Sequence, residues 1–334
     1  MTAWKRMRIY LGLALFGICL VSFIGLGLYS PPRYIQNFEE YEYARETPFI
    51  EPVSVLDGLA VYTVGTGVPV LLFPYPHGHT TEPMAQGPLA DLLVRMGRMV
   101  ISFDVPGAYR STRKPIGDMD EMIRSADEAL NRLGIQGPVD VVGHSMGGFA
   151  ALAYAIERPE RTRRLVLSNS VSGFPAAARC GFPGSAFSIL DPDYWRIILW
   201  GIRVNGGRAD LALHKRLQNL MEGVAYFDKS FFTAVEVEAD DRDQGVPIRM
   251  IWSKNMYAGL SYADRLQEVA AMTLVLAGRH DPEAALPCSE ELMAGIADAR
   301  LIIFENSGHA PFIEEVSLFE DTVAEFLKQD GVSQ

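Results

Sequence analysis

A serine set between glycines is the residue with the clearest chemical potential in this chain. Residues 143–148 read Gly-His-Ser-Met-Gly-Gly, with Ser145 as the third residue, after a short apolar run. The Gly-x-Ser-x-Gly spacing lets a strand turn sharply into a helix and exposes the hydroxyl at the carboxyl edge of a sheet. The expected chemistry is nucleophilic attack by Ser145 on a carbonyl carbon. The alternative is a glycine-rich turn with a capping serine.

A hydroxyl group needs a base to take its proton, and that base needs an acid to orient it. His309, in Asn306-Ser307-Gly308-His309, directly follows the last predicted strand and is the expected base. Asp281 follows an apolar run and a glycine turn, and it is the expected acid. The competing acids are Glu283 and Glu305. His280 is a poor base, because Asp281 is its immediate neighbour.

Two backbone N–H groups are expected to hold the negative charge that develops on the carbonyl oxygen. One is that of Met146, the residue after the nucleophile. The other should come from the loop Pro-Tyr-Pro-His-Gly-His-Thr at residues 74–80. Its His77-Gly78 pair resembles the start of this loop in many α/β hydrolases, and the resemblance implies that the N–H of His79 donates. His77 and His79 could also be metal ligands, but no third ligand stands nearby, so no metal or other cofactor is expected.

These side chains must be gathered by a sheet whose strands alternate with helices. Apolar runs predict a hairpin of strands at 54–56 and 60–64, and then strands at 70–73, 99–103, 139–142, 164–167, 273–276 and 300–304. Helical segments are predicted at 89–96, 119–133, 146–157, 289–296 and 317–327. Alternation of this kind predicts an α/β fold with a mostly parallel sheet flanked by helices.

The alternation stops between the sixth and seventh strands, which predicts an inserted domain. Residues 171–266 contain the helical stretches Tyr194–Trp200 and Leu211–Leu220 and are interpreted as a helical cap. The two halves of the core are then residues 53–170 and 267–334. Residues 31–52 are interpreted as a linker or arm, after an N-terminal segment of residues 1–30.

The N-terminal segment differs in composition from the rest of the chain. Lys5, Arg6 and Arg8 precede an uncharged apolar run at residues 9–29, which as a helix would span roughly 30 Å. The basic flank predicts a single-pass membrane anchor through residues 9–29, with the catalytic domain extracytoplasmic. The alternative is a cleaved signal peptide and a secreted protein.

Bulk composition excludes some functions and leaves others open. The 334-residue chain is 49% hydrophobic and carries a net charge of −11, which argues against a nucleic-acid partner. Cys180 and Cys288 are expected as free buried thiols, with a single bridge between them as the alternative. The oligomeric state stays open.

The motifs together resemble the α/β-hydrolase superfamily over nearly everything after residue 52. Residues 278–282 (Gly-Arg-His-Asp-Pro) and 307–315 (Ser-Gly-His-Ala-Pro-Phe-Ile-Glu-Glu) are similar to the acid and histidine blocks of its proline iminopeptidase branch, peptidase family S33. The His-Gly-His-Thr loop departs from the His-Gly-Gly-Pro-Gly of that branch. The resemblance implies a helical cap and a Ser-Asp-His triad.

Three functional interpretations stay open. The resemblance favours a serine hydrolase of aminopeptidase type acting on a short-peptide or small-molecule substrate. Glu236 and Glu238 would then receive the α-ammonium group of that substrate, although charge runs are usually solvated surface. The alternatives are a carboxylesterase or lipase-like enzyme for small apolar esters, and a catalytically silent binding protein on the same fold.

Overall fold

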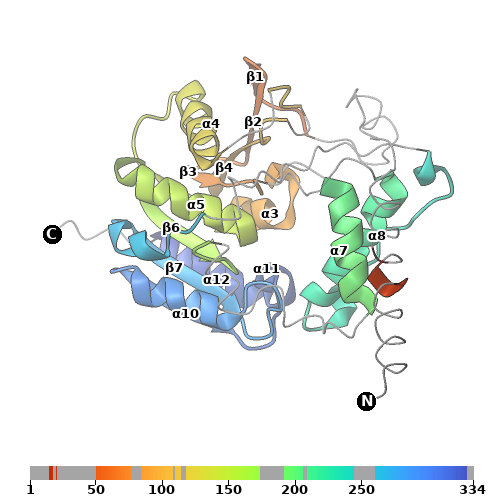
Figure 1. The fold of residues 1–334 in the computed structure, drawn as a ribbon. Helices are drawn as coiled ribbons and strands as arrows, with labels where there is room; N and C mark the ends of the chain where they lie inside the picture. The colour runs from red at the N-terminus through yellow and green to blue at the C-terminus, as the bar shows by residue number, and fades with distance from the viewer. Residues whose placement is uncertain are drawn as a thin grey trace.

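A twisted sheet forms the centre of the molecule. The computed structural model describes residues 15–17, 20, 50–76, 84–107, 110–113, 118–173, 192–205, 209–243 and 260–328. Within them an eight-stranded sheet has the order β1-β2-β4-β3-β5-β6-β7-β8 (Figure 1). The strands are β1 (Ser54–Leu56), β2 (Leu59–Val64), β3 (Val68–Leu72), β4 (Arg98–Phe103), β5 (Val139–His144), β6 (Thr162–Ser168), β7 (Met272–Gly278) and β8 (Ala299–Phe304).

Strand direction follows from the connections. β1 and β2 form the predicted hairpin, and β2 runs antiparallel to β4. The hairpin turn places Asp57 and Gly58 at φ 48° and 72°, the conformation that makes Asp-Gly a strong hairpin signal. From β3 to β8 all pairings in the sheet are parallel. The carboxyl ends of β5, β6, β7 and β8 therefore meet at one edge.

Helices cover both faces of the sheet. They are α3 (Pro88–Arg95), α4 (Met119–Arg132), α5 (Ser145–Glu157), α10 (Leu286–Gly295), α11 (Pro311–Glu314) and α12 (Val316–Lys328), with the short 3-10 helices η1 (Met84–Gln86), η2 (Pro159–Arg161) and η5 (Ala263–Glu268). Alternate residues of the strands point to opposite faces. On β3, Leu71 packs in the cluster under α4, α5 and α10, while Val70 and Leu72 pack in the cluster under α3 and α12.

A helical insertion separates β6 from β7. It contains α7 (Pro192–Asn205), α8 (Leu211–Ala225), η3 (Lys229–Phe231) and η4 (Asp240–Arg242), and Figure 1 shows α7 and α8 beside the sheet core. A small apolar cluster joins the two helices, including Ile197, Leu213 and Leu217. The helical character predicted for this region is therefore found. Residues 174–191 and 244–259 lie outside the described part, and the limits 171–266 stay a prediction.

A buried carboxylate organises the amino end of the sheet. Asp140 of β5 is fully buried and receives Arg98 at 3.3 Å, Arg163 at 2.7 Å and Arg164 at 3.2 Å. Arg98 also donates to the carbonyl oxygen of Leu327 at the end of α12. The network ties three strands and a helix together at the edge opposite the one that receives the candidate catalytic residues.

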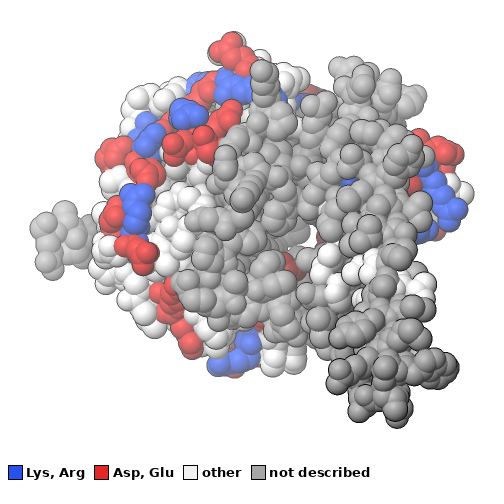
Figure 2. All heavy atoms as spheres, in the orientation of Figure 1, with Lys and Arg blue, Asp and Glu red and all other residues white. Residues whose placement is uncertain are grey.

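Surface charge is mixed on the face shown in Figure 2. Over the region of α4, acidic and basic side chains are interspersed rather than gathered by sign. Arg113, for example, binds both carboxylate oxygens of Glu128 at 2.8 Å. The described part of this face therefore lacks the basic field that a nucleic-acid surface needs.

Two expectations from the sequence are corrected here. Among the described residues, no helix combines the length and the apolar character that a membrane crossing requires. We therefore withdraw the anchor through residues 9–29, most of which lie outside the described part, together with the extracytoplasmic placement. Cys288 is also not a free thiol, because it is disulfide-bonded. Sequence separation alone does not indicate which cysteines the fold brings together.

Candidate active site

Ser145 occupies a strained turn between β5 and α5. Its φ of 52° lies in the left-handed region, which is unfavourable for a residue with a side chain. A hydrogen bond of 2.8 Å from the Ser170 hydroxyl to the Ser145 carbonyl oxygen helps to hold this backbone. The flanking glycines are required, since a Cβ on Gly148 would come within 2.6 Å of Ser170 and one on Gly147 within 2.7 Å of the Phe73 carbonyl oxygen. Strain of this kind often marks a functional site.

His309 and Asp281 form a buried hydrogen-bonded pair. Asp281 follows β7, His309 follows β8, and both are buried. Nδ1 of His309 lies 3.0 Å and 2.9 Å from the two carboxylate oxygens of Asp281, so Nδ1 carries a proton. Nε2 is then the atom that can accept a proton from a nucleophile. The structure thus brings together the acid and the base that the sequence indicates.

Asn169 is a polar contact of this pair that sequence reasoning missed. It follows β6 at φ 49°, and its Nδ2 donates to Asp281 at 2.8 Å and to the Gly308 carbonyl oxygen at 3.1 Å. The backbone N–H groups of Glu283 and Ala284 also donate to Asp281, at 2.8 and 3.0 Å. The available signal was an asparagine directly after a parallel strand, since asparagine tolerates positive φ.

His144 connects the Ser145 turn to His309. Its Nε2 donates to the His309 carbonyl oxygen at 2.8 Å, and its Nδ1 accepts from the Tyr75 hydroxyl at 2.5 Å. The rings of His144 and His309 have centroids 4.7 Å apart. Burial lowers the pKa of His144 to about 3, so this ring stays neutral. The neighbour of Ser145 in the chain therefore contacts the candidate base directly.

The electrostatics of the pair favour a charged imidazolium. Burial alone would lower the pKa of His309, but the negative charges of Asp281 and Glu283 raise it to about 9. Burial would likewise raise the pKa of Asp281, but the charge of His309 and the hydrogen bonds it receives hold it below its ordinary value. The site stabilises the charge that His309 would acquire on accepting a proton.

Glu283 faces the outer nitrogen of His309. Its Oε2 lies 3.5 Å from Nε2, whereas Asp281 contacts Nδ1. Burial raises the pKa of Glu283 and also that of Glu222 on α8. Burial and then the charges of Glu283 and Glu222 raise the pKa of Tyr75. Glu283 therefore adds a second carboxyl group, after that of Asp281, beside the candidate base.

The other competing groups have partners elsewhere. Glu305 binds Arg279 at 2.6 and 2.8 Å and is exposed. The ring of His280 stacks on Phe227 of the insertion with centroids 3.9 Å apart. Both observations agree with setting these residues aside as acid and base.

The candidate oxyanion donors are only partly described. Met146 is half-buried in the first turn of α5, and the approach of Gly147 to Phe73 places this turn against the end of β3. His77 and His79 lie outside the described residues, so the role of His79 stays a prediction. In the part of the chain that the structure describes, no group of three or more His, Cys, Asp or Glu side chains could hold a metal ion.

Glu236 and Glu238 lie in the insertion, and their substrate-binding role stays a prediction. Both are exposed in the insertion, and neither carboxylate has a hydrogen bond or ion pair within the described residues. The backbone N–H of Glu238 donates to Asp241 at 2.7 Å, which is a contact local to this segment.

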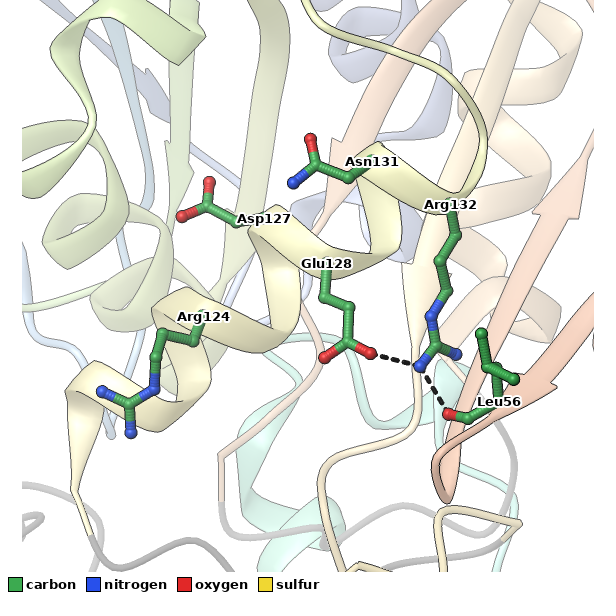
Figure 3. A pocket seen from close by; sticks show the side chains of 6 residues that line it. All are labelled: Leu56, Arg124, Asp127, Glu128, Asn131 and Arg132. Atoms are coloured by element: carbon green, nitrogen blue, oxygen red, sulfur yellow. Dashed lines mark hydrogen bonds and ion pairs between the residues drawn. The ribbon is translucent and has the colours of Figure 1, made fainter.

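A surface hollow of about 450 Å³ lies away from these residues, at α4 and the end of β1 (Figure 3). Its acidic and basic groups are largely paired with each other, since Arg132 binds both Glu128 and the Leu56 carbonyl oxygen. Asp127 binds Arg158 at 2.7 Å. The hollow contains none of the strained or buried groups that mark the Ser145 edge, and we do not assign it a catalytic role.

Comparison with known proteins decides the family. A family model described as "Alpha/beta hydrolase family" matches residues 70–322. The chain belongs to the alpha/beta hydrolase family. This α/β hydrolase is 29% identical over 249 residues to 2-hydroxy-6-oxononadienedioate/2-hydroxy-6-oxononatrienedioate hydrolase from Cupriavidus pinatubonensis, covering 70% of this chain and 78% of that protein.

Solved structures share the fold. An alpha/beta fold family hydrolase from Bacillus anthracis has a TM-score of 0.63 at 18% identity, covering 80% of this chain and 94% of that one. An esterase from Exiguobacterium antarcticum has a TM-score of 0.56 at 22% identity, covering 84% and 99%. The expected fold and superfamily are confirmed. The proline iminopeptidase branch is not supported, because the relative above is named as a hydrolase of a different substrate class.

Proposed function

We propose that this α/β hydrolase cleaves a carboxylic ester through an acyl-enzyme formed on Ser145. The observation that carries the proposal is the strained Ser145 turn, whose neighbour His144 contacts His309, with Nδ1 of His309 bonded to Asp281. This arrangement supports a nucleophile, a base and an orienting acid.

In the proposed reaction, Ser145 Oγ attacks the ester carbonyl carbon while Nε2 of His309 takes its proton. Asp281 fixes the imidazole and stabilises its positive charge. The N–H groups of Met146 and His79 are proposed to hold the oxyanion. His309 then protonates the leaving alcohol, and afterwards it activates the water that hydrolyses the acyl-enzyme.

Cleavage of a carbon–carbon bond is a second candidate. It is favoured by the relative from Cupriavidus pinatubonensis, whose name states a dioate substrate. The Glu283 carboxyl group, 3.5 Å from Nε2 of His309, argues for the neutral ester instead, since a carboxylate there would repel a dioate. We do not propose the aminopeptidase activity, since the relative from Cupriavidus pinatubonensis is named as a hydrolase of a dioate.

Labelling and turnover test the proposal together. The wild-type chain should react with a fluorophosphonate probe and hydrolyse p-nitrophenyl acetate. Ser145→Ala should abolish labelling and lower kcat by about 10⁴-fold or more. Ser125→Ala is the matched control, since Ser125 is a buried serine of α4 that donates to the Glu121 carbonyl oxygen.

Three outcomes would refute the proposal. Labelling of the Ser145→Ala variant would mean that the nucleophile is elsewhere. Faster cleavage of a 2-hydroxy-6-oxo-dienedioate than of p-nitrophenyl esters would favour the carbon–carbon candidate. A wild-type chain that neither labels nor turns over any of these substrates would support a silent binding protein.

A further inference from the structure

The loop that carries His309 has its backbone held from several directions. We call residues 306–309 the base loop. Its carbonyl groups accept hydrogen bonds from the backbone of His280 at 3.0 Å, from Asn169 at 3.1 Å and from His144 at 2.8 Å. Those three donors all belong to the core. The N–H groups of Gly308 and His309 have different partners, and these connect the loop to the insertion.

The end of α8 binds the base loop directly. The last carbonyl groups of a helix have no partner within the helix and must find one elsewhere. The carbonyl oxygen of Ala225 accepts the N–H of His309 at 2.7 Å. Lys229 donates to the Val224 and Tyr226 carbonyl oxygens on either side, at 3.2 and 2.5 Å. The candidate base is thus part of the cap of an insertion helix.

Glu314 of α11 bridges the same two segments. Its Oε1 accepts from the N–H groups of Phe227 and Asp228, at 2.7 and 3.1 Å, just after α8. Its Oε2 accepts from the N–H of Gly308 at 2.6 Å. Because the two oxygens belong to one rigid carboxylate, displacement of residues 227–228 is passed on to the residue before His309.

The base loop and the residues that follow α8 are closely packed against each other. A Cβ on Gly308 would overlap the carbonyl oxygen of Ala225 and approach the nitrogen of Phe227 to 2.9 Å. Neighbouring Glu315 behaves differently, since it binds the N–H of Asn306 at 3.0 Å and the Ser307 hydroxyl at 2.6 Å, both within the base loop. Glu314 is therefore the acidic side chain that joins the insertion to this loop.

We infer that Glu314 is a positioning residue. Its carboxylate holds His309 at a fixed position relative to the end of α8, so that the position of α8 determines the position of His309. The inference rests on the proposed function, in which His309 is the base. Small displacements of a catalytic group reduce rate strongly, about 10²-fold for 1 Å. Loss of the bridge should therefore lower kcat more than it affects substrate binding.

The test compares Glu314→Gln with Glu320→Gln in the full-length chain. An amide oxygen can accept from one segment, but the NH2 group then opposes an N–H of the other, so the bridge is lost with little change in size. Glu320 is the control, a glutamate of α12 paired with Arg95 at the surface. Active sites are counted by fluorophosphonate titration, so that kcat on p-nitrophenyl acetate refers to folded enzyme.

Hydrogen–deuterium exchange gives a readout that is independent of activity. In Glu314→Gln we expect faster exchange both at 226–228 and at 308–309, a fall in kcat per active site of about tenfold or more, and KM within about twofold of wild type. Glu320→Gln should leave all three quantities unchanged.

Three results would overturn the inference. Exchange that rises in one segment alone would show that the two are not coupled. A normal kcat per active site despite faster exchange at both segments would show that the Glu314 bridge does not position His309. A lower kcat without any change in exchange would mean that Glu314 acts by another route. Failure of the proposed function would be recognised separately, by a wild-type chain that does not label at Ser145, while exchange would still decide the coupling.

Discussion

Replacement of Glu283 by glutamine should make the enzyme faster at neutral pH. The Glu283 carboxylate lies 3.5 Å from Nε2 of His309 and, together with Asp281, raises the pKa of His309 to about 9. His309 can act as a base only when it is neutral. Activity should therefore rise with pH through this pKa, and any change that lowers the pKa should move the rise to lower pH.

The size of the effect follows from the geometry. An opposite charge within about 4–6 Å shifts a pKa by about 1–3 units, and we take about one unit because Asp281 and Glu314 still act on the ring. With a pKa of about 9, roughly 1% of His309 is neutral at pH 7, and with a pKa of about 8 roughly 10% is. The value of kcat/KM at pH 7 should rise about tenfold, with little change in the alkaline plateau.

The assay is kcat/KM for p-nitrophenyl acetate between pH 5.5 and 10, corrected for spontaneous hydrolysis. Glu305→Gln is the matched control, because it also removes one carboxylate, but an exposed one that binds Arg279. That variant should leave the profile in place. An acidic limb that stays fixed in Glu283→Gln, or that moves to higher pH, would refute the electrostatic reasoning.

Two further predictions concern the framework. Asp140→Asn should lower the free energy of unfolding by about 3–5 kcal/mol, measured by urea denaturation, because it leaves Arg98 and Arg164 buried without their carboxylate; a loss under 1 kcal/mol would contradict this. Gly278→Ala should lower kcat while the chain still folds, because the new Cβ would overlap the Gly308 carbonyl oxygen and displace the base loop. Gly201→Ala on α7 is its control, since nothing lies within 4 Å of the added atom, and it should stabilise by about 0.5–1 kcal/mol. Equal activity of the two alanine variants would rule out the steric argument.

The sheet could be predicted from sequence because its strands are continuous apolar runs separated by helical patterns. The Ser145 turn carried its own local signal, since glycines at fixed spacing are what a strained strand-to-helix turn needs. The positions of Asp281 and His309 after the last two predicted strands then indicated the acid and the base, and the structure brings the two together. Local pattern was sufficient wherever the relevant contact is between neighbours in sequence or follows from a shared sheet edge.

The features of the site that the sequence did not predict depend on contacts between distant segments. Asn169 reaches Asp281 across 112 positions, and Glu314 reaches Phe227 across 87, so neither role leaves a local pattern. The substrate-binding role predicted for the acidic residues of the insertion is untested and stays a prediction. Glu236 and Glu238 form a visible charge run but are exposed, whereas Glu222 sits on the buried side of α8 with no such signal.

The bond between the Ala225 carbonyl oxygen and the His309 N–H has a consequence for protein engineering. Insertions between the sixth and seventh strands are attractive modules to exchange when a new substrate range is wanted. In this chain such a graft would also replace the Ala225 carbonyl group, which accepts the hydrogen bond from the N–H of His309. Chimeras should therefore keep residues 225–228 from the parent and place the junctions outside them.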